Sequence, residues 1–350
     1  TVCEFCSESE LKHQQYEAAR QPADCENPLT KPKWVDEKKM ARGQAYFKRY
    51  FLMMFTSKLV SLMCILAYES ILKVLRFTGK SSTPQTAYRR YLGTLKHIIS
   101  WYSGDIWDPQ SKAHRSLVMV RKMHTSSHRS AVKANITMTS QLDMVVTQWA
   151  FMGLALTHGQ HLGMRGTKEE LEGFVHFWRC AGYLLGIEDR FNLCRGTLDD
   201  VKKECHNVLH EHILPAMTRP PEGFESMSAA LLNGTHMVVP FIDEGAFRQY
   251  SHYVIGLPFE IKHLGNYQRL LFNLKFLVYE KVLHIPVLGD LVRIILNFLL
   301  SLAINISSNI PSVTFYFTKI EMAITNLYID VTFYILKFYK GITSLLHLDN

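Results

Sequence analysis

The sequence lacks the local motifs that mark most common enzyme classes. It has no HExxH metalloprotease motif, no GxSxG nucleophile turn, no Walker phosphate loop and no GxGxxG dinucleotide turn. It also has no CxxCH site for covalent haem attachment. These absences leave two classes of protein: one that holds haem without a covalent bond, and one that is not catalytic.

Disulfide scaffolding and nucleic-acid binding have little support. The seven cysteines are odd in number and widely scattered, which argues against a disulfide framework. The CxxC formed by Cys3 and Cys6 has no partner pair, so a zinc knuckle is not expected. The formal charge is +8, yet no Lys/Arg block exceeds three residues, and we therefore expect a solvated basic surface and no nucleic-acid partner.

The sequence has few alternating Val/Thr stretches, and its apolar residues recur at helical spacing. Thr83 followed by Pro84 is typical of an N-cap and first helical position. Capping boxes are expected at Ser140, Thr167 and Thr197. Of the 350 residues, 47% are apolar and 20% are charged, with 20 Phe and 16 Tyr. The sequence therefore predicts an all-α fold, a large helical bundle whose pockets are apolar and aromatic.

Three regions are expected along the chain. Residues 1–40 are polar, contain three prolines and are predicted to be an irregular lead-in. Residues 41–215 are predicted to form the helical core, in which the long apolar stretch 41–77 is a buried helix pair or an interfacial helix. Residues 216–350 are predicted to complete the fold with apolar helices. These helices either contact a membrane surface or pack as a helical subdomain.

The sharpest local feature is one helix, predicted from Ser116 to about Lys133. On it Arg121, His124 and His128 fall at i, i+3 and i+7 and so share a face. A single helix supplies too few ligands for a closed zinc site. Haem needs only one axial histidine, cations for its propionates and an apolar cavity. A solvated face of Arg and His is the alternative for these residue types.

Two other stretches carry candidate residues. In Trp178–Ile187, Gly182 and Gly186 form a GxxxG pattern, which indicates close helix packing or contact with a flat ligand. His158 and His161 follow an apolar helix near its end and are further candidate ligands, although exposed terminal histidines are the common case.

Several segments together resemble the rubber-oxygenase (latex-clearing-protein) family and the related ER-bound fungal oxygenases that shorten a prenyl chain. The similarity is greatest to animal members of unassigned activity. The matching pieces, in order, are SSTPQTAYRR (82–91), RxxH (121–124), DMVVTQWAFMG (143–153) and WRCAGYLLGIED (178–189). The resemblance implies an all-α fold around a non-covalently bound haem b, and cleavage of a C=C bond by O2 to give two carbonyl ends.

The resemblance also implies roles for particular residues. Arg121, His124 and Thr125 match the family's motif and are the expected catalytic residues, with His124 as iron ligand. Gln148, Trp149, Arg179 and Gly182, together with His128, are the other expected cofactor contacts. Many bacterial relatives carry a histidine where this chain has Thr147-Gln148-Trp149. The ligand is therefore expected to be His124, with His161, His158 and His128 as alternatives.

The expected function is a haem b-dependent oxygenase that acts with O2 on an isoprenoid-like or unsaturated lipid. The expected location is the endoplasmic reticulum or another membrane. The alternative is a catalytically degenerate, membrane-associated helical protein that binds lipid or haem. The oligomeric state stays open.

Overall fold

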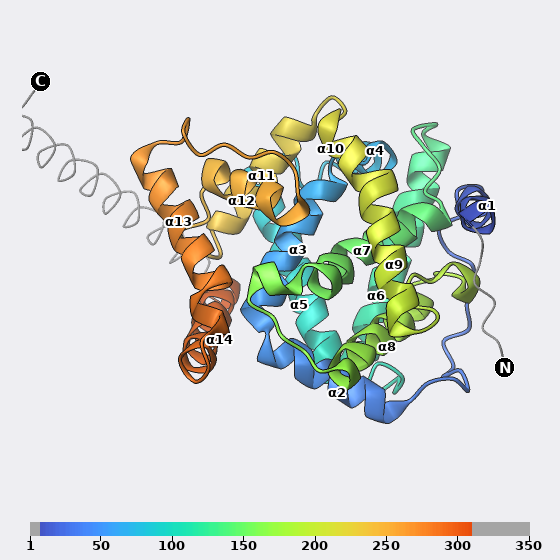
Figure 1. Cartoon of the computed structure of the whole chain (residues 1–350). Helices are drawn as coiled ribbons and strands as arrows, with labels where there is room; N and C mark the ends of the chain where they lie inside the picture. Colours follow the sequence, from blue (N-terminus) through green and yellow to red (C-terminus); the bar gives the residue numbers. More distant parts are fainter. Residues whose placement is uncertain (1–7, 310–350) are drawn as a thin grey trace, which may run out of the picture.

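The chain folds into packed α-helices, as the sequence predicts (Figure 1). The computed structural model describes residues 8–309, with side chains from residue 13 onward. Within this range, the β-structure consists of one isolated antiparallel bridge between Pro22 and Ser140. The α-helices are α1 Glu8–Ala18, α2 Glu37–Arg49, α3 Phe51–Ile65, α4 Glu69–Thr78, α5 Pro84–Ser103, α6 Lys112–Lys133, α7 Gln141–Thr157, α8 Lys168–Leu184, α9 Leu198–Val208, α10 Leu214–Thr218, α11 Phe224–His236, α12 Glu244–Ile255, α13 Asn266–Glu280 and α14 Leu288–Asn309.

The predicted helix starts are confirmed by their caps. Thr83 is the N-cap of α5, and Pro84 is the first residue of that helix. Capping boxes at Ser140, Thr167 and Thr197 begin α7, α8 and α9. Each cap contributes about 1 kcal/mol to its helix. The prediction that the next helix, α6, starts at Ser116 is wrong. The hydroxyl of Ser111 accepts a hydrogen bond from the backbone N–H of Ala113, so the helix begins at Lys112.

The lead-in is more ordered than the sequence suggests. Its residues Glu8–Ala18 form α1, because they contain no Pro or Gly and several good helix formers. The irregular segment that follows contacts the start of α7 and the residues just after α8. The Gln141 side-chain amide donates to the carbonyls of Pro22, Ala23 and Gly186, each at 3.0 Å. This segment therefore belongs to the core. Cys3 and Cys6 lie outside the described residues.

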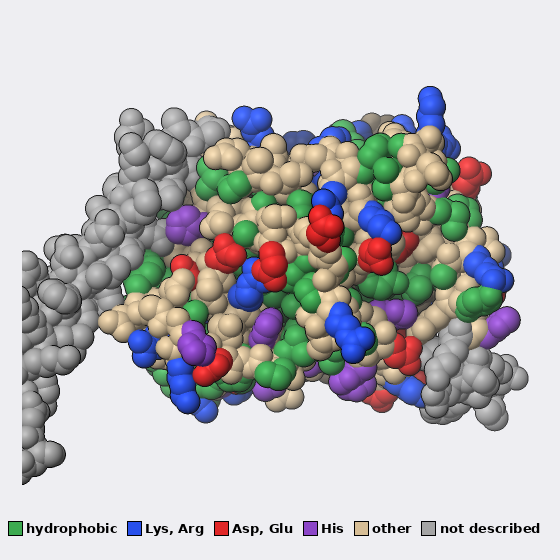
Figure 2. Space-filling view, turned by 90° about the horizontal axis from the view of Figure 1, so that it is seen from above, with side chains coloured by type: hydrophobic (Ala, Val, Ile, Leu, Met, Phe, Trp, Pro, Cys, Tyr) green, Lys and Arg blue, Asp and Glu red, His purple; other side chains and the backbone are tan. Residues whose placement is uncertain are grey.

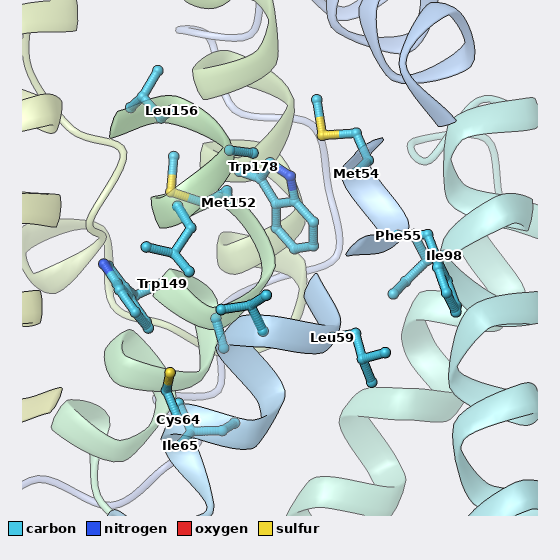
Figure 3. Packing of buried hydrophobic residues seen from close by; sticks show 14 of the residues in the cluster. Met54, Phe55, Leu59, Cys64, Ile65, Ile98, Trp149, Met152, Leu156 and Trp178 are labelled. Carbon is cyan, nitrogen blue, oxygen red and sulfur yellow. The ribbon is translucent and has the colours of Figure 1, made fainter. Parts of the chain in front are cut away.

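Helix α3 is the centre of the core, so the prediction of a buried helix in this apolar stretch is confirmed. Figure 3 shows Phe55 and Leu59 on the side of α3 that faces Ile98 of α5. Trp149 and Trp178 approach from α7 and α8. The walls of any internal space here are thus apolar and aromatic.

The C-terminal helices continue the bundle. Helix α11 packs along α5, and α12 to α14 form one side of the molecule (Figure 1). Helix α9 runs on through a π-helical turn, Leu209–Ile213, into α10, which ends at Thr218. The division of the chain at residue 215 stays a prediction, and the apolar segment 314–339 lies outside the described residues.

Candidate functional site

Arg121 lies on α6 and binds the lead-in. Its guanidinium makes a bidentate pair with Asp24, with an Nη2–Oδ1 distance of 2.6 Å and an Nε–Oδ2 distance of 3.0 Å. A third hydrogen bond, 2.8 Å long, goes to the carbonyl of Asn27. Thr125 donates its hydroxyl to Oδ2 of Asp24 at 2.9 Å. Two of the predicted catalytic residues thus hold one carboxylate.

The environment of Asp24 favours its charged form. Partial burial alone would raise the pKa of the carboxyl, but the hydrogen bonds from Arg121, the Glu26 N–H and Thr125 outweigh it, and the pKa is lowered. A carboxylate that accepts several hydrogen bonds behaves in this way. Arg121, Thr125 and Asp24 therefore act as a clasp between α6 and the lead-in.

His124 differs from Arg121 and Thr125 in the state of one ring nitrogen, Nδ1. The Nδ1 atom is buried and makes no hydrogen bond within the described residues. Burial, with the nearby positive charge of Arg90, lowers the pKa of the imidazole to about 4. The ring is therefore neutral at physiological pH and offers an unshared electron pair.

Arg90 is a residue that the sequence analysis missed as a site residue. It lies on α5, close enough to His124 to lower that residue's pKa. Burial lowers the pKa of its guanidinium. Within residues 13–309, the Arg90 guanidinium forms no hydrogen bond or ion pair. The signal in the sequence was an arginine beside the apolar face of the 84–103 helix.

The other predicted cofactor contacts already have partners inside the protein. The Gln148 amide donates to the Trp178 carbonyl at 2.9 Å and to the Asn192 side chain at 3.0 Å. The Trp149 indole N–H donates to the Cys205 carbonyl at 2.9 Å. Gly182 leaves room for Gln148, since a Cβ there would lie 2.5 Å from the Gln148 Nε2.

Arg179 and His128 are likewise paired. Arg179 forms a bidentate ion pair with Asp189, and its guanidinium lies 4.1 Å from the ring centre of Trp34. Nδ1 of His128 accepts a hydrogen bond from the Thr139 N–H at 3.1 Å. A haem contact at these residues stays a prediction.

The alternative ligands His158 and His161 lie at the end of α7. The ring of His158 is hydrogen-bonded to the Thr157 hydroxyl at 2.8 Å. Burial, with the neighbouring His161, His206 and His210, lowers its pKa to about 4. His161 lies 2.9 Å from the Glu280 carboxylate and so links this turn to α13. Both rings therefore have contacts that His124 lacks.

Two apolar hollows adjoin α3. One is a narrow space between α3, α5 and α11, and the other lies between α2, α3, α5, α7 and α8; each has interior room for about one or two water molecules. Lys58 borders both. The remaining walls are almost entirely aliphatic and aromatic.

The residues present fit haem better than a closed metal site. Within residues 8–309 no group of three or more His, Cys, Asp or Glu could hold a metal ion. Haem instead needs one axial nitrogen, cations for its propionates and an apolar cavity. Within the described residues, the unpaired Nδ1 of His124 and the nearby guanidinium of Arg90 fit the first two needs, whereas neither residue borders either of the two hollows.

Residues 46–235, more than half of the chain, match the family model described as the ER-bound oxygenase mpaB/B'/rubber oxygenase catalytic domain. The chain belongs to this family. It also resembles a solved structure of latex clearing protein in the closed state, with 16% identity and a TM-score of 0.47. That similarity covers 87% of this chain and 81% of the other. No curated protein matches the sequence.

Membership of the oxygenase family agrees with the resemblance seen in the sequence. The matched segment extends beyond the motifs quoted above, which end at residue 189, to residue 235. It therefore includes nearly all of α11, which packs along α5. It also contains Arg121, His124 and Lys58. The family is described as ER-bound oxygenases.

Proposed function

We propose that the protein is a haem b-dependent oxygenase that uses O2 to cleave or oxidise a C=C bond of an isoprenoid-like or unsaturated lipid. The observation that carries the proposal is the buried, neutral and unpaired Nδ1 of His124, in a chain of the rubber-oxygenase family. When bound, haem supplies the O2 chemistry, and the protein supplies the ligand and the pocket.

His124 would hold the iron, and Arg90 would pair with a propionate. The imidazole stays neutral down to about pH 4, so its electron pair is available over the physiological range. The Asp24–Arg121 pair fixes α6 and thereby the position of His124 on it. The apolar walls around Lys58 exclude water and suit a substrate with few polar groups.

Absorption spectroscopy of the purified chain, with hemin added, tests the proposal. We expect a Soret band that is lost or shifted in His124→Ala, because that variant lacks the iron ligand. His263→Ala is the matched control, since its ring is 83% exposed and remote in sequence. An unchanged band in His124→Ala would reject His124 as ligand. No band in the folded parent protein would reject haem.

The C-terminal helices supply the proposed contact with a membrane. By length and composition α14 could span a bilayer, as could α3 and α4 as one pair bent by 95°. Only 22% of the α14 window is buried, whereas α3 lies in the core. The inner side of α14 is anchored by Asn297, which accepts a hydrogen bond from the Leu52 N–H, and by Leu300 and Ile304.

The outward-facing sides of α13 and α14 form a region rich in exposed large apolar residues. Its exposed side chains are Leu270, Leu274 and Leu277 on α13, and Leu288, Leu291, Ile294, Ile295, Phe298, Leu299 and Leu302 on α14. The face in Figure 2, by contrast, carries acidic and basic side chains close together. A patch of this kind is typical of a membrane or protein contact. Since the family is described as ER-bound, we propose that it lies in a bilayer interface.

Sedimentation with phosphatidylcholine vesicles tests this surface. The double variant Ile294→Asp/Phe298→Asp should bind vesicles at least about tenfold more weakly, because each apolar side chain withdrawn from lipid forfeits about 1.5–3 kcal/mol. Met119→Asp, at a side chain that is 54% exposed on α6, is the control. Equal vesicle binding by both variants would contradict the assignment.

A further inference from the structure

Three Asn-x-Ser/Thr triplets, the acceptor sequence for N-linked glycosylation, occur in the chain, at Asn135, Asn233 and Asn305. The sequence alone does not rank them. An asparagine that carries a glycan must keep its side chain at the surface of the folded protein, because the attached group is bulky and polar. The structure separates the three triplets by their backbone conformation, exposure and hydrogen bonds.

Asn135 lies in the turn that ends α6, and a Schellman motif holds its backbone there. The N–H of Asn135 donates to the Val132 carbonyl at 3.0 Å, and the N–H of Ile136 donates to the Ala131 carbonyl at 2.9 Å. Asn135 has a φ of 56°, the left-handed conformation that closes such a motif. Glycine is the usual residue at this position and would close the turn equally well. The turn therefore does not by itself require an asparagine.

The side chain of Asn135 is available as an acceptor. The residue is exposed, as are its two neighbours in sequence. Neither its Nδ2 atom nor the hydroxyl of Thr137 makes a hydrogen bond within residues 13–309. The same turn exposes the apolar side chains of Val132, Ile136 and Met138. A large polar glycan beside them would shield this apolar group from contact with other molecules.

The other two triplets lie within helices and face the protein. On α11, Nδ2 of Asn233 donates to Oε2 of Glu244 at 3.3 Å, and Thr235 of the same triplet is buried. Asn305 is part of α14, the helix that we propose to lie in the bilayer interface, and Ser307 of its triplet is buried. Asn135 is thus the one acceptor of the three in an exposed turn.

We propose that Asn135 carries an N-linked glycan and that the turn after α6 therefore faces the lumen of the endoplasmic reticulum. In the transfer, Nδ2 of Asn135 attacks C1 of an oligosaccharide that is attached to a lipid pyrophosphate. The N–C bond forms as the C–O bond to the pyrophosphate breaks. The lipid pyrophosphate leaves and Nδ2 loses one proton, so no oxidant or reductant takes part. The inference rests on the proposed location at this membrane and does not depend on haem.

The position of α6 agrees with membrane contact through α13 and α14. Figure 1 shows α13 and α14 on the left of the molecule and α6 in its right half, so a glycan at the end of α6 leaves the proposed membrane surface uncovered. The lumen is also an oxidising compartment. Weakly ionised thiols react slowly there, and burial raises the pKa of each described cysteine, namely Cys25, Cys64, Cys180, Cys194 and Cys205.

Gel mobility and peptide mapping of the full-length protein from eukaryotic membranes test the site. Peptide N-glycosidase should increase the mobility of the parent protein by one glycan, and mapping should find the resulting conversion of asparagine to aspartate at Asn135. Thr137→Val should abolish this shift, because it removes the hydroxyl of the acceptor triplet, whereas Thr137→Ser should retain it. Asn135→Gly should also abolish the shift while it keeps the turn closed.

Asn233→Ala and Asn305→Ala are the matched controls, since each removes an acceptor that lies in a helix, and both should leave the shift unchanged. A shift that persists in Thr137→Val would overturn the assignment to Asn135. The absence of any shift in the parent protein would overturn the proposal as a whole. Soret and vesicle measurements on protein made in bacteria, without a glycan, test the proposed function separately, so the two failures are distinguishable.

Discussion

Replacement of Arg121 by methionine is expected to lower the free energy of unfolding by about 3–5 kcal/mol, the usual cost of removing one partner of a buried ion pair. The Asp24 carboxylate would lose its bidentate partner, and the Asn27 carbonyl would lose its donor. The side chains of Arg121 and Asp24 are only 11% and 19% exposed, so water replaces these contacts poorly. Urea unfolding followed by circular dichroism measures the effect.

The double variant Arg121→Met/Asp24→Leu separates this pair from the general cost of mutation. It should recover part of the loss, because no buried charge remains unpaired. Lys73→Met is the control, since it breaks a pair with Glu69 whose side chains are 51% and 67% exposed. That change should cost less than about 1 kcal/mol. Equal costs for Arg121→Met and Lys73→Met would refute the clasp between α6 and the lead-in.

The same pair adds to the acid sensitivity of the fold. The pKa of Asp24 is lower in the folded state than its ordinary value of 3.8. Its contribution to stability is therefore complete above that value and is lost as pH falls through the lower folded pKa. The Asp24→Leu variant should lack this part of the acid transition.

Substitution of Gly43 by alanine is the second large effect that we expect. An alanine Cβ at Gly43 of α2 would lie 2.4 Å from the Gly173 carbonyl oxygen of α8. The Cβ is fixed rigidly to the backbone of α2 and the oxygen belongs to the backbone of α8, so relief requires the two helices to separate, at a cost of about 3 kcal/mol. Thermal unfolding should show a lower midpoint and a less cooperative transition.

Gly93→Ala is the matched control for this prediction. Gly93 lies inside α5, and a Cβ there meets no atom within 4 Å. Alanine at this position should stabilise the protein by about 0.5–1 kcal/mol, because it restricts the unfolded chain and favours helix. A Gly43→Ala protein as stable as Gly93→Ala would show that α2 and α8 do not cross this closely.

Part of the candidate site could be found from the sequence because it depends on spacing within one helix. Arg121, His124 and Thr125 were identified on one stretch of α6, and their helix was confirmed. Their partners could not be found in this way. Asp24 is separated from Arg121 by 97 positions, and it lies in a lead-in that was expected to be irregular.

Lys58 and Arg90 escaped the sequence analysis for a related reason. Each is a charged residue in an apolar helix, where a lysine or arginine usually reaches out to solvent. Only the packing of α7 against α3 and of α6 against α5 shows that Lys58 is buried and that Arg90 lies beside His124. The prediction of His124, by contrast, needed only the motif.

By itself, the sequence determined the all-α class and most helix starts. Caps and apolar periodicity act between residues three or four positions apart. The family motif on α6 is equally local. The tertiary structure alone decided which of these residues are paired and which are free. Burial and pairing depend on segments that are remote in sequence, and it is their packing that left Nδ1 of His124 and Nζ of Lys58 without a hydrogen-bond partner in the part of the chain that the structure describes.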